Sequence, residues 1–220
     1  MKRVAAGLLA LLLASTALGE TTSSTETVLD FEQSETAKLP AGFVPALTGG
    51  GGPVEWVIRE DPTAPRGAKV LVQTSADRTD YRFPLCIYDA VTAKDVAVSV
   101  RCKPVSGKVD QACGLIARFQ DNGNYCVVRA NALEDNVRLY RVVGGNRKEF
   151  AGKNAKVSSG VWHTLRVEAK GKHFTVSFDG KRLFEADDET FKGPGKIGLW
   201  TKADSVTEFD DLKIENYGAR

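Results

Sequence analysis

The 220-residue sequence has only two histidines, and this scarcity removes several classes of catalytic site. His163 lies between Val161 and Leu165 on what reads as the buried face of a strand, so we expect a structural histidine there. His173 lies beside a turn. The sequence contains no H-E-x-x-H, no cysteine pair with zinc spacing and no G-x-S-x-G. A hydrolase with this sequence would have to use carboxylates, tyrosine or a bound metal.

Strong net charge and long apolar runs are also lacking. The formal net charge is +2, and it falls to zero if Lys2 and Arg3 are removed with an N-terminal signal. A neutral mature chain gives no electrostatic reason to expect nucleic acid or an anionic membrane as a partner. The apolar run at residues 4–14 is too short to span a bilayer, and no later stretch reads as a membrane anchor, so we expect no membrane insertion.

The first 19 residues read as a cleaved signal peptide. A basic start, Lys2-Arg3, precedes the apolar run, and the small residues Ala17 and Gly19 flank Leu18 where signal peptidase cleaves. No cysteine follows the run, which argues against a lipoprotein. We therefore expect a secreted or periplasmic protein whose residues 20–27 form a flexible polar lead and whose residues 28–217 form a single β-sandwich domain.

Helical periodicity is absent from the mature chain, and short strand-like runs separated by turn signals recur instead. The turn signals include Ser106-Gly107 and Asp179-Gly180. This spacing predicts an all-β fold, an antiparallel sandwich of two sheets. Residues 40–53 and 59–66 are rich in glycine or proline and read as irregular loops that could border a binding face. The expected strands span residues 28–31, 54–59, 69–73, 83–88, 96–102, 112–120, 125–130, 136–143, 162–169, 173–178, 182–185, 196–201 and 206–214.

The three central strands, 112–120, 125–130 and 136–143, have two faces of opposite character. If the first hairpin pairs Gln120 with Tyr125, small and apolar side chains share one face, among them Leu115 and Val128. The other face carries arginine and tyrosine between apolar residues, and it is the candidate working surface. The alternative is that these polar residues serve solubility and cross-strand pairing.

Five residues are candidates for binding sugar on that surface. Guanidinium groups and aromatic rings bind sugar hydroxyls, carboxylates and flat pyranose faces. Arg118 and Arg129 would hold hydroxyls or a carboxylate, and Tyr125 would stack on a ring. Asn131 and Asn136 would add hydrogen bonds.

Glu134, in the loop after the second strand, is the best single candidate for general acid or base catalysis. The neighbouring Asp135 could raise the pKa of Glu134 by like-charge repulsion. Two other apparent motifs are set aside. Residues 185–189, EADDE, have the spacing of one class of glycosidase strands but the composition of a loop. Residues 193–198, GPGKIG, match G-x-G-x-x-G without the flanking strand and helix that a dinucleotide site requires.

Four cysteines in an exported chain make disulfides possible. Cys102 shares one face with Val96, Val98 and Val100, and the following loop could bring Cys113 opposite Cys102. We expect a Cys102–Cys113 bridge, with Cys86 and Cys126 either paired or buried separately. The alternative is that all four are free thiols in the core.

Carboxylates near the two ends of the chain suggest one metal site. Asp30 and Glu32 lie in the first strand, and Asp210 and Asp211 lie in the last. Because terminal strands of sandwiches often pair, these four side chains could form a Ca²⁺ site. The alternative is that they are solvent-facing strand acids.

Several stretches resemble a known family. GVWHTLRV at 160–167, FDGK at 178–181, GKIGLW at 195–200 and FDDL at 209–212 are similar to concanavalin A-like or laminin-G-like sandwiches. More narrowly, these stretches and NYCVVRANALEDN at 124–136 resemble the 3-keto-disaccharide hydrolase domain family. The resemblance covers nearly all of residues 28–217.

This resemblance implies a jelly-roll whose concave sheet faces sugar and, in catalytic members, hydrolysis of glycosides that contain an oxidised sugar. The expected function is therefore an exported carbohydrate-active protein, a glycoside hydrolase acting on 3-keto-glycosides or related disaccharides. The alternatives are a lectin-like module without catalysis and a structural sandwich domain of the cell envelope.

Overall fold

The computed structural model describes residues 24–218, and strands are the only regular elements in that range. The expected signal peptide lies outside the described residues. No helix within residues 24–218 is long and apolar enough to cross a membrane. The strands are β1 (Thr25–Leu29), β2 (Phe43–Gly49), β3 (Trp56–Glu60), β4 (Lys69–Gln73), β5 (Arg82–Ala93), β6 (Val96–Ser106), β7 (Ala112–Asp121), β8 (Asn124–Asn131), β9 (Asn136–Val143), β10 (Asn146–Asn154), β11 (His163–Lys170), β12 (His173–Phe178), β13 (Lys181–Asp187), β14 (Gly195–Trp200) and β15 (Val206–Asn216).

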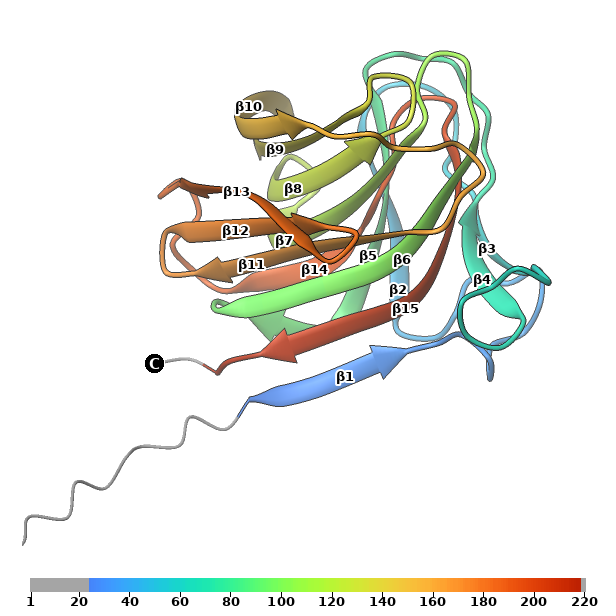
Figure 1. Ribbon diagram of the computed structural model, residues 1–220, viewed down its shortest axis with the longest axis horizontal. Coiled ribbons are helices and arrows are strands. Elements are labelled where there is room, and N and C mark those ends of the chain that lie inside the picture. Colours follow the sequence, from blue (N-terminus) through green and yellow to red (C-terminus); the bar gives the residue numbers. More distant parts are fainter. Residues whose placement is uncertain (1–23, 219–220) are drawn as a thin grey trace, which may run out of the picture.

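Two antiparallel sheets pack face to face, which confirms the expected all-β sandwich (Figure 1). Sheet A has the order β13-β12-β11-β6-β15-β4-β3, and β1 adds to β15. Sheet B has the order β10-β9-β8-β7-β14-β5-β2. The first and last strands pair, as expected, from Thr25 opposite Asn216 to Leu29 opposite Leu212. Residues 25–27, expected in the flexible lead, therefore belong to the sheet.

Sequence patterns missed two strands. β2 lies within the segment expected to be an irregular loop, and it pairs with β5 along its whole length. β10 is mostly polar and exposed, and it forms the edge of sheet B beside β9. Both are edge strands with little buried apolar surface, so their sequences carry little of the alternation by which strands are recognised.

The main core lies between the sheets. Leu115, Cys126 and Val128 point into it, as the alternation of the central strands predicted. The hairpin register differs, because Ala117, not Phe119, pairs with Cys126. A bulge accounts for the shift: the pairing slips between Ala117 and Asp121, and Arg118 adopts a left-handed φ of 55°.

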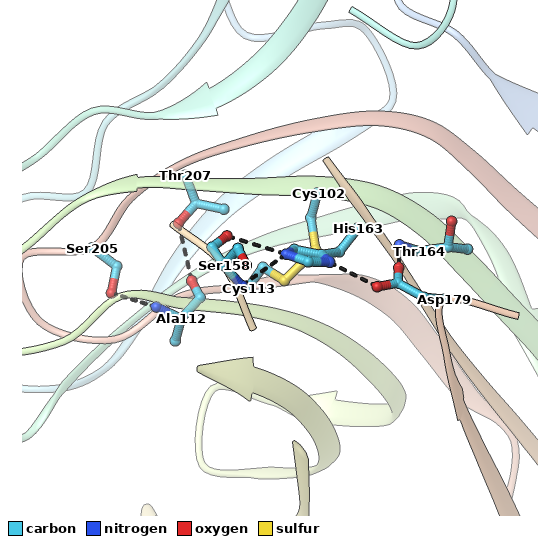
Figure 2. The surroundings of a disulfide bond; sticks show 9 residues. All are labelled: Cys102, Ala112, Cys113, Ser158, His163, Thr164, Asp179, Ser205 and Thr207. Atoms are coloured by element: carbon cyan, nitrogen blue, oxygen red, sulfur yellow. Dashed lines mark hydrogen bonds and ion pairs between the residues drawn. A yellow bond between two sulfur atoms is a disulfide. The ribbon is translucent and has the colours of Figure 1, made fainter. Parts of the chain in front are cut away.

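The disulfide between Cys102 and Cys113 confirms the expected bridge and links the two sheets across the core (Figure 2). Cys102 lies on β6 in sheet A, and Cys113 lies on β7 in sheet B, with a Cα–Cα distance of 6.3 Å. Cys86 and Cys126 are free thiols, each buried in the core, which was one of the two arrangements expected for them.

His163 lies beside this bridge and is a structural histidine, as expected (Figure 2). Its ring is buried and stacks on Phe178 with centroids 4.9 Å apart. Nδ1 lies 2.8 Å from an Asp179 carboxylate oxygen, and Nε2 lies 3.1 Å from the backbone N of Ser158. Both nitrogens are engaged within the fold, so the ring has no nitrogen left for a substrate.

The proposed calcium site does not form. No group of three or more His, Cys, Asp or Glu side chains within residues 24–218 is arranged to hold a metal ion. Instead, Glu32 accepts hydrogen bonds from the backbone N–H groups of residues 68 and 69, and Asp210 accepts from those of Arg66 and Asp211. Asp211 pairs with Arg66 at 3.2 Å, and Asp30 accepts from the backbone of Glu32. Glu32, Asp210 and Asp211 therefore hold the segment around Arg66 against the sandwich.

Candidate functional site

The outer face of sheet B, turned away from the main core, carries a second apolar cluster. All its members come from strands of this sheet, and most are fully buried. The residues are Phe83, Leu85, Ile87, Ala112, Ile116, Tyr125, Val127, Tyr140, Val142 and Trp200. Large apolar side chains on an outer face are typical of a covered or ligand-binding surface.

Arg147, at the start of β10, covers the centre of this cluster. Its guanidinium carbon lies 4.5 Å from the ring centroid of Tyr140, 4.7 Å from that of Phe83 and 5.5 Å from that of Trp200. The Tyr81 hydroxyl holds the same hairpin in place, since it donates to Gly145 O at 2.7 Å and accepts from the backbone N of Arg147 at 2.9 Å. Arg147 therefore covers the aromatic side chains of the cluster through cation–π contacts.

Tyr125 belongs to this buried cluster and cannot stack on a sugar as predicted. Its side chain is fully buried, and its hydroxyl lies 2.9 Å from that of Thr48. Burial raises the pKa of Tyr125 to about 12, although the Thr48 hydrogen bond works against this shift. The expectation failed because alternation shows which face a side chain is on but not which residues far away in the sequence, such as Thr48, pack around it.

Arg118 also lies away from the expected surface. The bulge turns its side chain toward the main core, where it is 1% exposed and its guanidinium carbon lies 5.0 Å from the Phe174 ring centroid. It donates to the carbonyl oxygens of Phe191 and Gly171. Arg118 and Arg129 therefore do not share a surface, contrary to the prediction.

Four polar residues meet where the β8–β9 hairpin turns, and three of them are predicted site residues. Arg129 donates from Nη1 to Asn136 Oδ1 at 2.8 Å and from Nη2 to Glu134 Oε2 at 2.7 Å. Nη2 also donates to the Tyr140 hydroxyl at 3.0 Å. Asn136 Nδ2 donates to the same Glu134 oxygen at 2.9 Å. We call Arg129, Glu134, Asn136 and Tyr140 the Arg129 cluster.

Glu134 is the accessible carboxylate of the Arg129 cluster, with its side chain 46% exposed. Oε2 takes both hydrogen bonds, while Oε1 has no hydrogen bond to any residue from 24 to 218. Partial burial tends to raise the pKa of Glu134, but hydrogen bonds from Asn136 and Arg129 and the charges of Arg129 and Lys202 hold it below its usual value. Glu134 is therefore an ionised carboxylate at neutral pH.

The expected effect of Asp135 on Glu134 is wrong. Asp135 turns the other way, with a left-handed φ of 48°, and its carboxylate accepts from the backbone N of Val157 and pairs with Lys156 at 3.0 Å. These contacts lower the pKa of Asp135. Because the two adjacent acids point in different directions, repulsion by Asp135 does not raise the pKa of Glu134.

Asn131 joins the Arg129 cluster to a second carboxylate that sequence reasoning missed. Its Oδ1 accepts from the backbone N of Leu133, and its Nδ2 donates to Asp110 Oδ1 at 2.9 Å. Asp110 is buried and lies 3.2 Å from Lys202 Nζ. Burial raises the pKa of Asp110, partly offset by the charges of Arg129 and Lys202. Asp110 lies in the loop before β7, which pairs with β8, and Lys202 follows β14, which pairs with β7. Strand pairing within sheet B therefore brings both residues to β8.

A depression of about 250 Å³ lies on the same outer face, toward the β7–β8 turn. Ile87 and Ala46 lie at its apolar base, and the exposed Lys196–Asp89 ion pair borders it. Together with the Arg129 cluster, this face offers an ionised carboxylate, guanidinium and amide donors, and apolar surface. Such groups bind the hydroxyls and the apolar faces of sugars.

Solved structures with this fold include several carbohydrate-related proteins. A carbohydrate binding module, CBM66, from Bacillus subtilis is 17% identical with a TM-score of 0.62, and the match covers 80% of this chain and 96% of that one. A β-glucanase from Bacillus licheniformis is 12% identical with a TM-score of 0.56, covering 87% and 97%. Domain 4 of an extracellular arabinanase from Geobacillus stearothermophilus, in complex with arabinotriose, is 14% identical with a TM-score of 0.55, covering 86% and 90%.

At these identities the likeness establishes the fold and not the activity. No curated protein sequence matches the chain. The family model described as the 3-keto-alpha-glucoside-1,2-lyase-like domain matches residues 51–215, which include both strands of the β8–β9 hairpin and the loops that carry Asp110 and Lys202. The chain therefore belongs to the 3-keto-alpha-glucoside-1,2-lyase-like domain family, the 3-keto-disaccharide hydrolase family that its sequence resembles.

Proposed function

We propose that the protein cleaves glycosides whose glucose unit carries a keto group at C3, at the Arg129 cluster, with Glu134 as the proton acceptor. One observation carries this proposal. Glu134 holds Oε2 fixed between Arg129 and Asn136, while Oε1 has no hydrogen bond within residues 24–218 and the side chain is half exposed. This leaves one carboxylate oxygen oriented and available for a substrate proton.

The chemistry of a 3-keto-glucoside fits such a group. The C2 hydrogen is acidic because its removal gives an enolate stabilised by the C3 carbonyl. Glu134 Oε1 would take this proton, and the enolate would expel the oxygen substituent at C1, leaving a C1–C2 double bond. The expelled oxygen would take a proton from water, and the hydroxide that remains would recover the proton from Glu134. Arg129 and Lys202, whose charges already act on Glu134, would stabilise the enolate oxygen. Addition of water to the double bond would complete a net hydrolysis.

The test follows the products of a 3-keto-α-glucoside by proton NMR, with purified protein, in the presence and absence of EDTA. We expect loss of the C2 proton signal together with release of the C1 substituent. Glu134→Gln should slow release by about a hundred-fold or more, as expected for loss of a general base. Glu149→Gln, on the exposed strand β10, is the matched control and should retain full activity.

A second function, binding without turnover, is favoured by how fully the Arg129 cluster is hydrogen-bonded within the protein. Such a preorganised set of groups suits a binding site as well as a catalytic one. If folded protein releases nothing from 3-keto-glucosides but retains glucosides, and Glu134→Gln abolishes retention, the binding function replaces the catalytic one. If neither occurs, both functions fail.

We also propose that the protein works outside the cytoplasm, because residues 1–19 read as a signal peptide and Cys102–Cys113 suits an oxidising compartment. N-terminal sequencing of the protein recovered from the culture medium or the periplasm should begin at Glu20. Recovery of the uncleaved chain from the cytoplasm alone would contradict this proposal.

A further inference from the structure

Arg118 is a buried cation with neutral partners. Its two hydrogen bonds go to the carbonyl oxygens of Phe191 and Gly171. No carboxylate within residues 24–218 forms an ion pair with it, and the charges of Asp95 and Asp188 act on it only from a greater distance. Nε is buried and has no hydrogen-bond partner there. Burial lowers the pKa of Arg118, although the negative charges of Asp95 and Asp188 work against this shift. Burying a charge without a counter-ion is costly, and an anionic ligand would offset part of that cost.

A pocket of about 180 Å³ opens beside this guanidinium. Three turns contribute to it: β5–β6, β11–β12 and the segment between β13 and β14. The volume is that of roughly six water molecules, enough for a small anion or one sugar ring. The lining residues are Lys94, Arg118, Gly171, Lys172, Asp188, Glu189 and Lys192.

Cations outnumber acids in this lining, and the one buried acid is already neutralised. Asp188 pairs with Arg141 at 2.7 Å. Glu189 is exposed and lies 3.9 Å from Lys192. Lys94 has no ion-pair partner in the part of the chain that the structure describes. Lys172 pairs with Asp187 at 3.0 Å. Lys94 and the buried Arg118 are thus the lining cations without an ion pair within residues 24–218, and they give the pocket a positive potential.

We propose that this pocket binds a small oxyanion, a carboxylate or a phosphate group, between Arg118 and the surrounding lysines. Each terminal nitrogen of Arg118 carries two N–H groups, and the two carbonyl oxygens use one on each, which leaves one on each for an oxyanion. Lys94 and Lys192 would approach from the rim. The ligand would be either the carboxylate of an acidic sugar or free phosphate.

This pocket is separate from the Arg129 cluster. Arg129 pairs with Gly114 on β7, four residues along the strand from Arg118, a separation of about 13 Å. The bulge also places the Arg118 side chain on the core side of sheet B, whereas the Arg129 cluster lies on its outer face. The proposed anion binding can therefore be tested independently of the proposed sugar cleavage.

Isothermal titration calorimetry with inorganic phosphate, glucuronate and glucose tests the proposal on the purified protein. We expect saturable binding of phosphate, glucuronate or both, and none of glucose. The rim variant Lys94→Gln/Lys192→Gln should weaken binding by about five-fold for each lysine removed. The matched control Lys148→Gln/Lys153→Gln removes the same charge from exposed positions on β10 and should leave binding unchanged. Arg118→Gln should abolish binding, with its fold checked by circular dichroism.

The outcomes separate the two ligand sources. Binding of glucuronate that phosphate does not displace indicates an acidic sugar, and binding of phosphate alone indicates free phosphate. The proposal is overturned if neither anion binds, or if the rim and control variants weaken binding equally. The rim variant keeps this result meaningful even if Arg118→Gln fails to fold, because Lys94 and Lys192 are not part of the core.

Discussion

Arg129 and Glu134, five residues apart, are joined by a 2.7 Å hydrogen bond between a buried guanidinium and a half-exposed carboxylate. The same guanidinium also bonds to Asn136 and Tyr140. One arginine therefore fixes both the carboxylate and the strand that follows it. This arrangement makes the β8–β9 turn rigid enough to position Glu134 for a substrate.

We predict that Arg129→Lys lowers the free energy of unfolding by about 2 kcal/mol, because lysine keeps the charge but cannot make three directed hydrogen bonds. Urea denaturation followed by circular dichroism measures this loss. Arg138→Lys is the control, since Arg138 pairs with Arg129 across the hairpin but makes its side-chain contacts at the exposed edge with Glu149 and Asn154. Equal destabilisation by the two substitutions would contradict the prediction.

Removal of the disulfide should cost about 3 kcal/mol, the loop-closure estimate for a separation of 11 residues. The variant Cys102→Ala/Cys113→Ala should show this loss in chemical denaturation, and wild type under reducing conditions should approach it. Cys86→Ala/Cys126→Ala should retain the wild-type dependence on reductant, because those two thiols are free and the bridge is intact. Tryptic peptides of unreduced protein that carry unlinked Cys102 and Cys113 would disprove the bridge.

The contribution of Asp210 to the stability of the protein should fall between about pH 4 and pH 7. Burial, together with the charges of Asp211 and Glu32, raises the pKa of Asp210 from 3.8 to about 6, against the backbone hydrogen bonds that lower it. In this window the folded chain binds more protons than the unfolded chain, so stability present at low pH is lost as the pH rises.

Asp210→Asn cannot titrate and isolates this contribution. Relative to the variant, wild type should lose about 2 kcal/mol of unfolding free energy over this pH range. Urea denaturation of both proteins at several pH values measures the difference. A difference that stays constant with pH would show that Asp210 does not titrate in this way.

Gly195→Ala should distort the bulge that carries Arg118. A Cβ at Gly195 would lie 2.6 Å from the Arg118 Cα, where only backbone movement could relieve the overlap. We expect a loss of about 1 to 3 kcal/mol, typical of overpacking, and a loss of anion binding. Gly193→Ala is the control, because its Cβ would meet no atom within 4 Å. Unchanged stability of Gly195→Ala would contradict the bulge geometry.

Alternation along the central strands predicted the two faces of sheet B, because residue parity survives small errors in strand ends. Val137 and Leu139 reach the main core, and Tyr140 lies on the outer face, as expected. The exact hairpin register was not predictable. The bulge at Arg118 depends on a left-handed φ at an arginine, which local sequence does not signal.

The candidate site was predicted only in part, because only some of its residues are close to one another in the sequence. Arg129, Glu134 and Asn136 lie within eight residues of one another, and so their meeting follows from a local hairpin. Asp110 and Lys202 join them only through long-range strand pairing. The burial of Tyr125 shows the same limit, since its contact with Thr48 joins strands that are far apart in the sequence and leaves no local pattern.

The most direct test of the central claim is a crystal structure of Glu134→Gln with a 3-keto-α-glucoside, since this variant should bind the substrate without consuming it. We predict that the sugar lies on the outer face of sheet B, with C2 next to the substituted side chain and the C3 carbonyl toward Arg129 or Lys202. A sugar bound elsewhere on the protein, together with turnover at the wild-type rate by the variant in solution, would contradict the account.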